Sequence, residues 1–214
     1  MVAAQPRDIS QERAEVTREK LLAAAIRCFT TIGYDAASTR VIEADAGVKR
    51  GLIAYHFKTK DVLWKAAVHW LFTRTGAEFL LAERNAADVD ADIGTRLRYF
   101  IRTLVRFSAR HPEVNRLMVK EGIHGDWRMD WLVTHYVRPL YARAEALFAQ
   151  ARAAGIAPAM DFPSFYYIAI GGSALLFTMA AEARHLAGVD VNDEAVINHH
   201  ADALARLLFP GGPS

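Results

Sequence analysis

Basic side chains that could bind a polyanion gather in one short stretch of the chain. Lys49, Arg50, Lys58 and Lys60 lie between positions 47 and 60, and no carboxylate interrupts them. Lysine and arginine neutralise phosphates, and both can donate hydrogen bonds to guanine O6 and N7 in the major groove. These charges could face a polyphosphate such as DNA, but by charge alone a solvated basic face on an ordinary helical bundle is the better interpretation.

A helix can enter the major groove only if its rear face is anchored and its front face is free. Two short helices joined across Gly47-Val48 would provide this arrangement as a helix-turn-helix. The first helix is predicted from a Ser38 cap through Ala46, and the second from about Lys49 to Phe57. The expected anchors are Ile42, Ala46, Val48, Ile53 and Phe57.

The order of residues between Gly33 and Trp64 resembles the DNA-binding segment of the TetR family of one-component repressors. The matching positions are Gly33, Tyr34, Ser38, Ile42, Ala46, Gly47, Val48, Gly51, Tyr55, His56, Phe57 and Lys60. The resemblance covers residues 14–65, and the number of helices expected in the remainder is also similar to that of the family.

The resemblance implies a role for each polar residue of this segment. The first residues of the second helix would contact DNA phosphates. The recognition helix, Lys49 to His56, would contact base edges and phosphates. The expected DNA-binding residues are Ser38, Thr39, Arg40, Lys49, Arg50, Leu52, Tyr55, His56, Lys58 and Lys60. Of these, Lys49 and Arg50 would donate to guanine and Leu52 would touch a thymine methyl.

Several residues depart from the family pattern. Glu43 and Leu52 replace small residues, and Ala54 replaces an aromatic one. Lys49 stands where the family often has a serine or threonine that caps the recognition helix, so a stabilisation of about 1 kcal/mol is expected to be missing. These changes affect the operator sequence that we expect and leave the mode of binding unchanged.

Every well-patterned segment after residue 63 also has helical spacing. The expected helices are 90–110, 112–123, 127–154 with a break near Pro139, 162–187, and 193–209 capped by Asn192. The predicted fold is all-α, with an N-terminal three-helix helix-turn-helix domain (1–62) and a C-terminal ligand-binding and dimerisation helical bundle (63–214). The net charge of +2 divides into +3 for residues 1–65 and −1 for the remainder, so the basic excess lies in the N-terminal domain.

The uncharged segment 162–181 is long enough to raise the question of a membrane span. Pro163 and the small residues 171–174 favour instead a buried helix that another helix approaches closely. With segment 193–209, whose inner stripe is Val196, Ile197, His200, Leu204, Leu207 and Leu208, it suggests a four-helix contact in a homodimer. The expected dimer-interface residues are Tyr167, Gly171, Ser173, Ala174, Ile197, Ala201, Leu204 and Leu208.

The larger domain is rich in aromatic side chains with polar groups between them. This composition suits a drug-sized ligand, although aromatic residues at helical spacing are also typical of a plain core. The expected ligand-binding residues are Phe107, Glu121, His124, Trp127, Trp131, His135, Tyr136, Tyr166, Tyr167 and Phe177. With the resemblance, they predict a ligand-responsive transcriptional regulator, typically a repressor that a small molecule releases from a pseudo-palindromic operator. No enzyme activity, cofactor or metal is expected.

The alternative is an enzyme, a di-iron carboxylate bundle. Glu121-Gly-Ile-His124 and Glu182-Ala-Arg-His185 are two Glu-x-x-His pairs on predicted helices, which is half of such a ligand set. The N-terminal residues lack the apolar core of a secretory signal, and the single cysteine, Cys28, suits a reducing compartment. We therefore expect a cytoplasmic protein without a membrane anchor.

Overall fold

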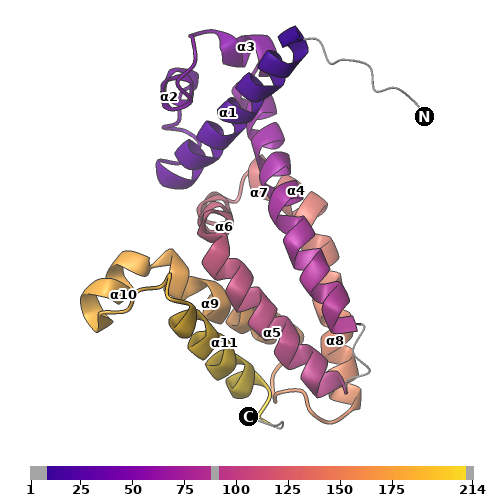
Figure 1. Ribbon diagram of the computed structural model, residues 1–214. Helices are drawn as coiled ribbons and strands as arrows, with labels where there is room; N and C mark the ends of the chain where they lie inside the picture. The colour runs from indigo at the N-terminus through magenta and orange to yellow at the C-terminus, as the bar shows by residue number, and fades with distance from the viewer. Residues whose placement is uncertain (1–8, 88–91, 211–214) are drawn as a thin grey trace, which may run out of the picture. The chain divides into compact units, whose positions relative to one another are not determined.

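The structure is a computed structural model that describes residues 9–87 and 92–210, and every regular element in these ranges is a helix (Figure 1). This confirms the predicted all-α class. The chain divides into two compact units, Met1–Thr73 and Arg74–Ser214. The boundary falls within one long helix, α4 (Lys60–Ala87).

The first unit packs three helices and the beginning of α4 around an apolar core. The helices are α1 (Ile9–Thr31), α2 (Thr39–Asp45) and α3 (Leu52–Phe57). The larger core side chains are Leu22, Ile26, Phe29, Ile42, Ile53, Phe57, Leu63 and Trp64. α1 ends before Gly33, whose φ of 87° lies in the left-handed region, as its sequence position predicts.

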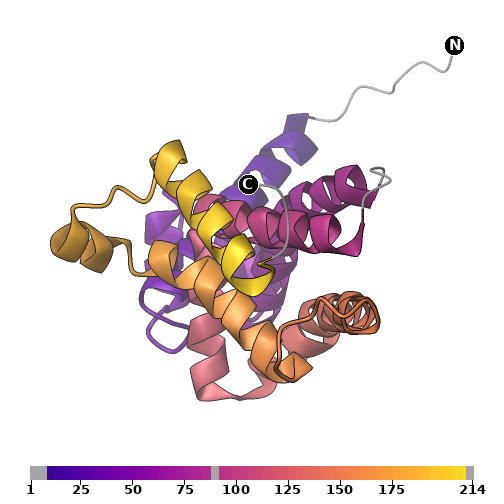
Figure 2. The same cartoon turned by 90° about the horizontal axis from the view of Figure 1, so that it is seen from below.

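The second unit contains the remaining helices. They are α5 (Ile93–Arg110), α6 (Pro112–His124), α7 (Trp127–Leu132), the π-helical segment η1 (Val133–Val137), α8 (Arg138–Ala153), α9 (Phe162–Thr178), α10 (Ala180–Ala187) and α11 (Glu194–Leu208). α5 packs against both α9 and α11, whereas α10 projects from the end of α9 (Figures 1 and 2). The apolar core of this unit lies among α5, α8, α9 and α11.

Gly172 allows α9 and α11 to approach closely. A Cβ atom at this position would lie 2.9 Å from Leu204 Cδ1, closer than such atoms pack. His200 from α11 also lies 2.7 Å from the Gly172 carbonyl oxygen through its Nε2 atom. The prediction that small residues here admit another helix is correct, and the helix admitted belongs to the same chain.

Two predicted features of the second unit are wrong, and a third is confirmed. The break expected near Pro139 is present as the π-helical segment η1, which ends just before that proline, since Pro139 cannot donate to a carbonyl one turn back. The predicted helix 162–187 bends by 73° between α9 and α10, beside Met179. The cap of α11 is Asp193, whose carboxylate accepts from the Ala195 amide at 2.8 Å, and not Asn192.

Within the described ranges, no individual helix has both the length and the apolar composition needed to cross a bilayer. Only α9 and α10 taken together reach both, and they are the pair separated by the 73° bend.

Candidate nucleic-acid interface

The two ends of α2 are fixed by the residues that the sequence suggested. Ser38 caps the helix, because its Oγ atom accepts from the Val41 amide at 3.3 Å. At the other end Gly47 adopts a φ of 64°, and its amide donates to the Ala44 carbonyl at 3.1 Å. The next amide, that of Val48, donates to the Glu43 carbonyl at 3.1 Å. These two bonds form a Schellman motif, which ends the helix sharply and starts the turn.

The recognition helix is shorter than predicted. Gly51 has a φ of 89°, so α3 begins at Leu52, and Lys49 and Arg50 lie in the preceding turn. The rear face is anchored as expected, since Ile53 is 1% exposed and Phe57 3% exposed. Tyr55, on the opposite face, is 77% exposed.

The missing helix cap is replaced by a side chain from α2. Gly51 has no side chain to cap α3, but Glu43 Oε1 accepts from the Ile53 amide at 2.9 Å. Glu43 itself is only 4% exposed. The expectation that the recognition helix lacks a cap is therefore wrong, because the acceptor comes from ten residues upstream in the sequence.

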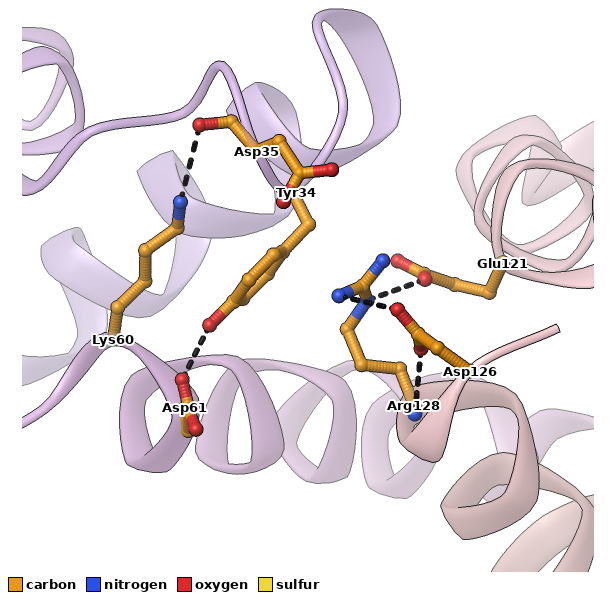
Figure 3. Close-up of polar contacts among 7 residues, drawn as sticks. All are labelled: Tyr34, Asp35, Lys60, Asp61, Glu121, Asp126 and Arg128. Atoms are coloured by element: carbon orange, nitrogen blue, oxygen red, sulfur yellow. Dashed lines mark hydrogen bonds and ion pairs between the residues drawn. The ribbon is translucent and has the colours of Figure 1, made fainter. Parts of the chain in front are cut away.

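Lys60 is held by the connection between α1 and α2. Its ammonium group donates to the Asp35 carbonyl at 3.4 Å and lies 4.2 Å from the centre of the Tyr34 ring (Figure 3). The Tyr34 hydroxyl in turn donates to the Asp61 carboxylate (Figure 3). Lys60 thus has a structural role in this unit, and its contact with DNA phosphate stays a prediction.

None of the ten expected DNA-binding side chains is buried in the core. The exposed ones are Ser38, Arg40, Lys49, Arg50, Tyr55 and Lys58, and the half-buried ones are Thr39, Leu52, His56 and Lys60. The anchored helix and the basic turn that precedes it can therefore meet a groove and its phosphates together.

The ten residues expected to bind a ligand do not gather in one place. Trp131 stacks on His135, with ring centres 4.4 Å apart, and Tyr136 lies edge-on to Trp131 at 5.6 Å. Tyr166 instead packs edge-on against Tyr141 at 4.8 Å, and burial raises the pKa of its hydroxyl. Burial likewise raises the pKa of Tyr136.

The other candidates are dispersed over the second unit. Glu121 is buried and accepts from Arg128 Nε at 2.6 Å, an ion pair that Asp126 extends at 2.9 Å (Figure 3). Phe177 is buried, Phe107 is half-buried, and His124, Trp127 and Tyr167 are exposed. A pocket of ≈ 480 Å³ at the connection from α8 to α9 is lined by Arg152, Gly155 and 157–161, and none of the ten lines it. The ligand-binding role of these residues stays a prediction.

Five of the eight residues expected at a dimer interface lie in the core of the second unit. They are Ser173, Ile197, Ala201, Leu204 and Leu208, all less than 9% exposed. Their helical spacing is the same as that of an interface stripe, but it faces α5 and the neighbouring helices of the same chain. Tyr167 and Gly171 are exposed, and Ala174 is half-buried. Leu207, expected on the inner stripe, is 73% exposed.

The di-iron alternative finds no support in the structure. Glu121 is occupied by Arg128, and His124, Glu182 and His185 are exposed. Among the residues that the structure describes, no group of three or more histidine, cysteine, aspartate or glutamate side chains could hold a metal ion.

Comparison with known proteins gives matches of two kinds. Residues 21–67 match the family model for bacterial regulatory proteins of the tetR family. An HTH-type transcriptional repressor of Mycobacterium tuberculosis is 40% identical over 58 residues, which make up 27% of this chain and 31% of that protein. The chain thus spans about a third of that relative's length.

Other matches extend along almost the whole chain. The HTH-type transcriptional regulator RutR of Escherichia coli is 21% identical over 202 residues, covering 94% of this chain and 93% of RutR. The crystal structure of a TetR-like transcriptional regulator from Rhodococcus has a TM-score of 0.62 at 18% identity, covering 95% of this chain and 96% of that one. At this identity the structural match shows that the fold is shared.

Proposed function

We propose that this chain, whose residues 21–67 match the model for bacterial regulatory proteins of the tetR family, is a repressor that a small molecule releases from operator DNA. The observation that carries the proposal is the anchored α3 with its exposed basic turn. Ile53 and Phe57 fix the helix from behind, while Lys49, Arg50 and Tyr55 remain accessible to a duplex. In this arrangement Arg50 reads a base edge and Lys58 neutralises a phosphate.

The test is selection of duplexes from a random 30-base-pair library, followed by titration of the recovered operator at several salt concentrations. Arg50→Ala should change the recovered sequence and cost about 1–3 kcal/mol on the original operator. Lys58→Ala should weaken all duplexes alike and lower the slope of log K against log salt by about one. The matched control is Lys20→Ala, an exposed lysine of α1 outside the expected contacts. If the wild type selects no sequence at low salt, the proposal fails.

We further propose that the effector binds near the aromatic group formed by Trp131, His135 and Tyr136. These three side chains lie on α7 and η1, and π-helical segments occur frequently at functional sites. An apolar or aromatic molecule would find a flat surface there and polar atoms at its edge. Calorimetry should show that the effector, once recovered by native mass spectrometry, competes with operator DNA. Independent binding of the two would exclude release by this route.

We propose finally that two copies bind one pseudo-palindromic operator, with half-sites about 34 Å apart. The contact would be the outward apolar face of α9 and α11, which includes Tyr167, Ile168, Leu175 and Leu207. These side chains replace the buried ones that the sequence suggested. A regulator of chromosomal genes in bacteria would carry out this function in the cytoplasm.

A further inference from the structure

Glu43 has the one buried carboxyl side chain of the first unit, among the residues whose burial is described. Asp45, two residues further along α2, is 40% exposed and forms an ion pair with Arg27 of α1 at 2.7 Å. Glu43 instead is directed toward α3, where the DNA-reading surface is built. A buried carboxylate is costly unless hydrogen bonds compensate it, so its partner indicates its role.

The stability of α3 depends on contacts with other parts of the chain. It has six residues, and helices of this length do not persist without tertiary contacts. Its first internal bond joins the Tyr55 amide to the Gly51 carbonyl at 3.0 Å, so the amides of the first turn must find acceptors elsewhere. Gly51 offers no side-chain acceptor.

Glu43 supplies the acceptor at the position where a helix cap would bind. Its Oε1 atom lies 2.9 Å from the amide of Ile53, the second residue of α3, which is a usual partner of a capping side chain. Its backbone carbonyl meanwhile accepts from Val48 at 3.1 Å and closes the end of α2. The same residue therefore fixes both sides of the turn that carries Lys49 and Arg50.

We propose that Glu43 is the N-terminal cap of the recognition helix, supplied by the preceding helix, and that this positioning residue sets the affinity for operator DNA. Its carboxylate contacts α3 at Ile53, whose side chain is buried, whereas the side chain of Tyr55 is exposed on the opposite face. Glu43 thus acts through the pose of α3 and the turn. Operator affinity falls in proportion to the fraction of molecules in which that pose is formed.

Two variants separate the hydrogen bond from the bulk of the side chain. Glu43→Gln keeps an oxygen acceptor at similar length, and its affinity for the selected operator should stay within about threefold of wild type. Glu43→Met keeps the length and has no acceptor, and its affinity should fall about tenfold. The matched control is Asp45→Asn, which removes a negative charge from the same helix without contact to α3 and should leave specificity unchanged.

Hydrogen exchange at the Ile53 amide, followed by NMR, reports on the cap itself. In the wild type and in Glu43→Gln this amide should exchange at least about tenfold more slowly than a free amide, and in Glu43→Met the protection should be lost. Unprotected Ile53 in the folded wild type would overturn the inference, even if Glu43→Met failed to fold. So would unchanged operator affinity in a folded Glu43→Met. The inference rests on the proposed DNA binding, whose own failure would show separately as a wild type that selects no operator.

Discussion

At Lys58 the backbone adopts a conformation that L-residues rarely take, with φ 65° and ψ −54°. The amide of Thr59 donates to the carbonyl of Phe57 at 2.8 Å, which makes this a strained three-residue γ-turn. Thr59 then caps α4, because its hydroxyl accepts from the Val62 amide at 3.2 Å. The strained turn therefore joins the recognition helix to α4 and fixes the direction in which each helix runs.

Replacing Lys58 by glycine should stabilise the protein. Relief of strain worth about 1–3 kcal/mol outweighs the added freedom of the unfolded chain, which costs about 0.4–1 kcal/mol. We expect the free energy of unfolding, measured by chemical denaturation, to rise by a net of about 1 kcal/mol, while operator affinity falls because a cation is lost. Lys49→Gly is the control, since positive φ among non-glycine residues of the described chain occurs only at Lys58. Equal effects of the two substitutions would show that the γ-turn stores no strain.

Residues whose role is local were predictable from the sequence, and residues whose role is tertiary were not. Ser38 could be identified as a cap because its partner, Val41, lies three residues away. Glu43 appeared only as a departure from the family pattern, because its partner amide lies ten residues away across a turn. Nothing in the spacing alone signals which atom a buried carboxylate will meet.

Helices as elements were predicted well, and so was the break before Pro139, but the bend between α9 and α10 was not. Periodic apolar residues define α5 and α6, and Pro112 marks the start of α6. The π-helical segment η1 ends just before Pro139, whereas the bend beside Met179 has no proline or glycine at the point of change. That bend depends on how neighbouring helices pack, which a single segment of sequence does not encode.

The junction of α6 and α7 depends on a buried ion pair. Glu121 and Arg128 are 2% and 4% exposed, and Asp126, itself 38% exposed, holds the outer side of the guanidinium. Glu121→Ala should cost about 3 kcal/mol of unfolding free energy, because it leaves a buried cation only partly compensated. Asp126→Asn should cost about 1 kcal/mol or less, since that carboxylate is screened by water. Chemical denaturation measures both, and equal losses would contradict this assignment.

Acid should destabilise the second unit through three aspartates. The Thr95 and Ser164 groups that donate to Asp92 and Asp161, and the Arg102 guanidinium beside Asp202, lower the pKa of each carboxyl. Folded pKa values below the unfolded value of about 3.9 mean that the stabilisation is complete above that pH and is lost as pH falls through the folded values.

The melting temperature should therefore fall below about pH 4. Asp161→Asn keeps a capping oxygen but cannot titrate, so its melting temperature should fall less steeply in acid than that of the wild type. The same change at exposed Asp130 of α7 serves as the control. If the melting temperatures of Asp161→Asn and the wild type fell equally steeply in acid, titration of the α9 cap would not contribute to acid destabilisation.

At the scale of the whole chain, the sequence is most informative about the first unit, and the structure is most informative about the second. The first unit carries a motif dense enough to predict its fold and its surface, and residues 21–67 match the family model. In the second unit the apolar pattern predicted helices and also interface residues, five of which are core. A stripe that faces a partner and a stripe that faces the same chain have identical spacing, so only the packing of α5, α9 and α11 separates them.

The exposed face of α9 and α11 leads to the prediction for the assembly. Leu175 is 62% exposed in the isolated chain, and in a dimer formed through this face a charge there would be buried without a partner. Leu175→Glu should give the 23.8 kDa mass of one chain by light scattering, and its affinity for an operator with two half-sites should fall to that for one. Leu186→Glu is the control, because Leu186 is 80% exposed on the projecting α10, outside this face (Figure 1). A dimer that survived Leu175→Glu and dissociated with Leu186→Glu would place the contact on α10, since a charge disrupts association only where the partner removes it from water.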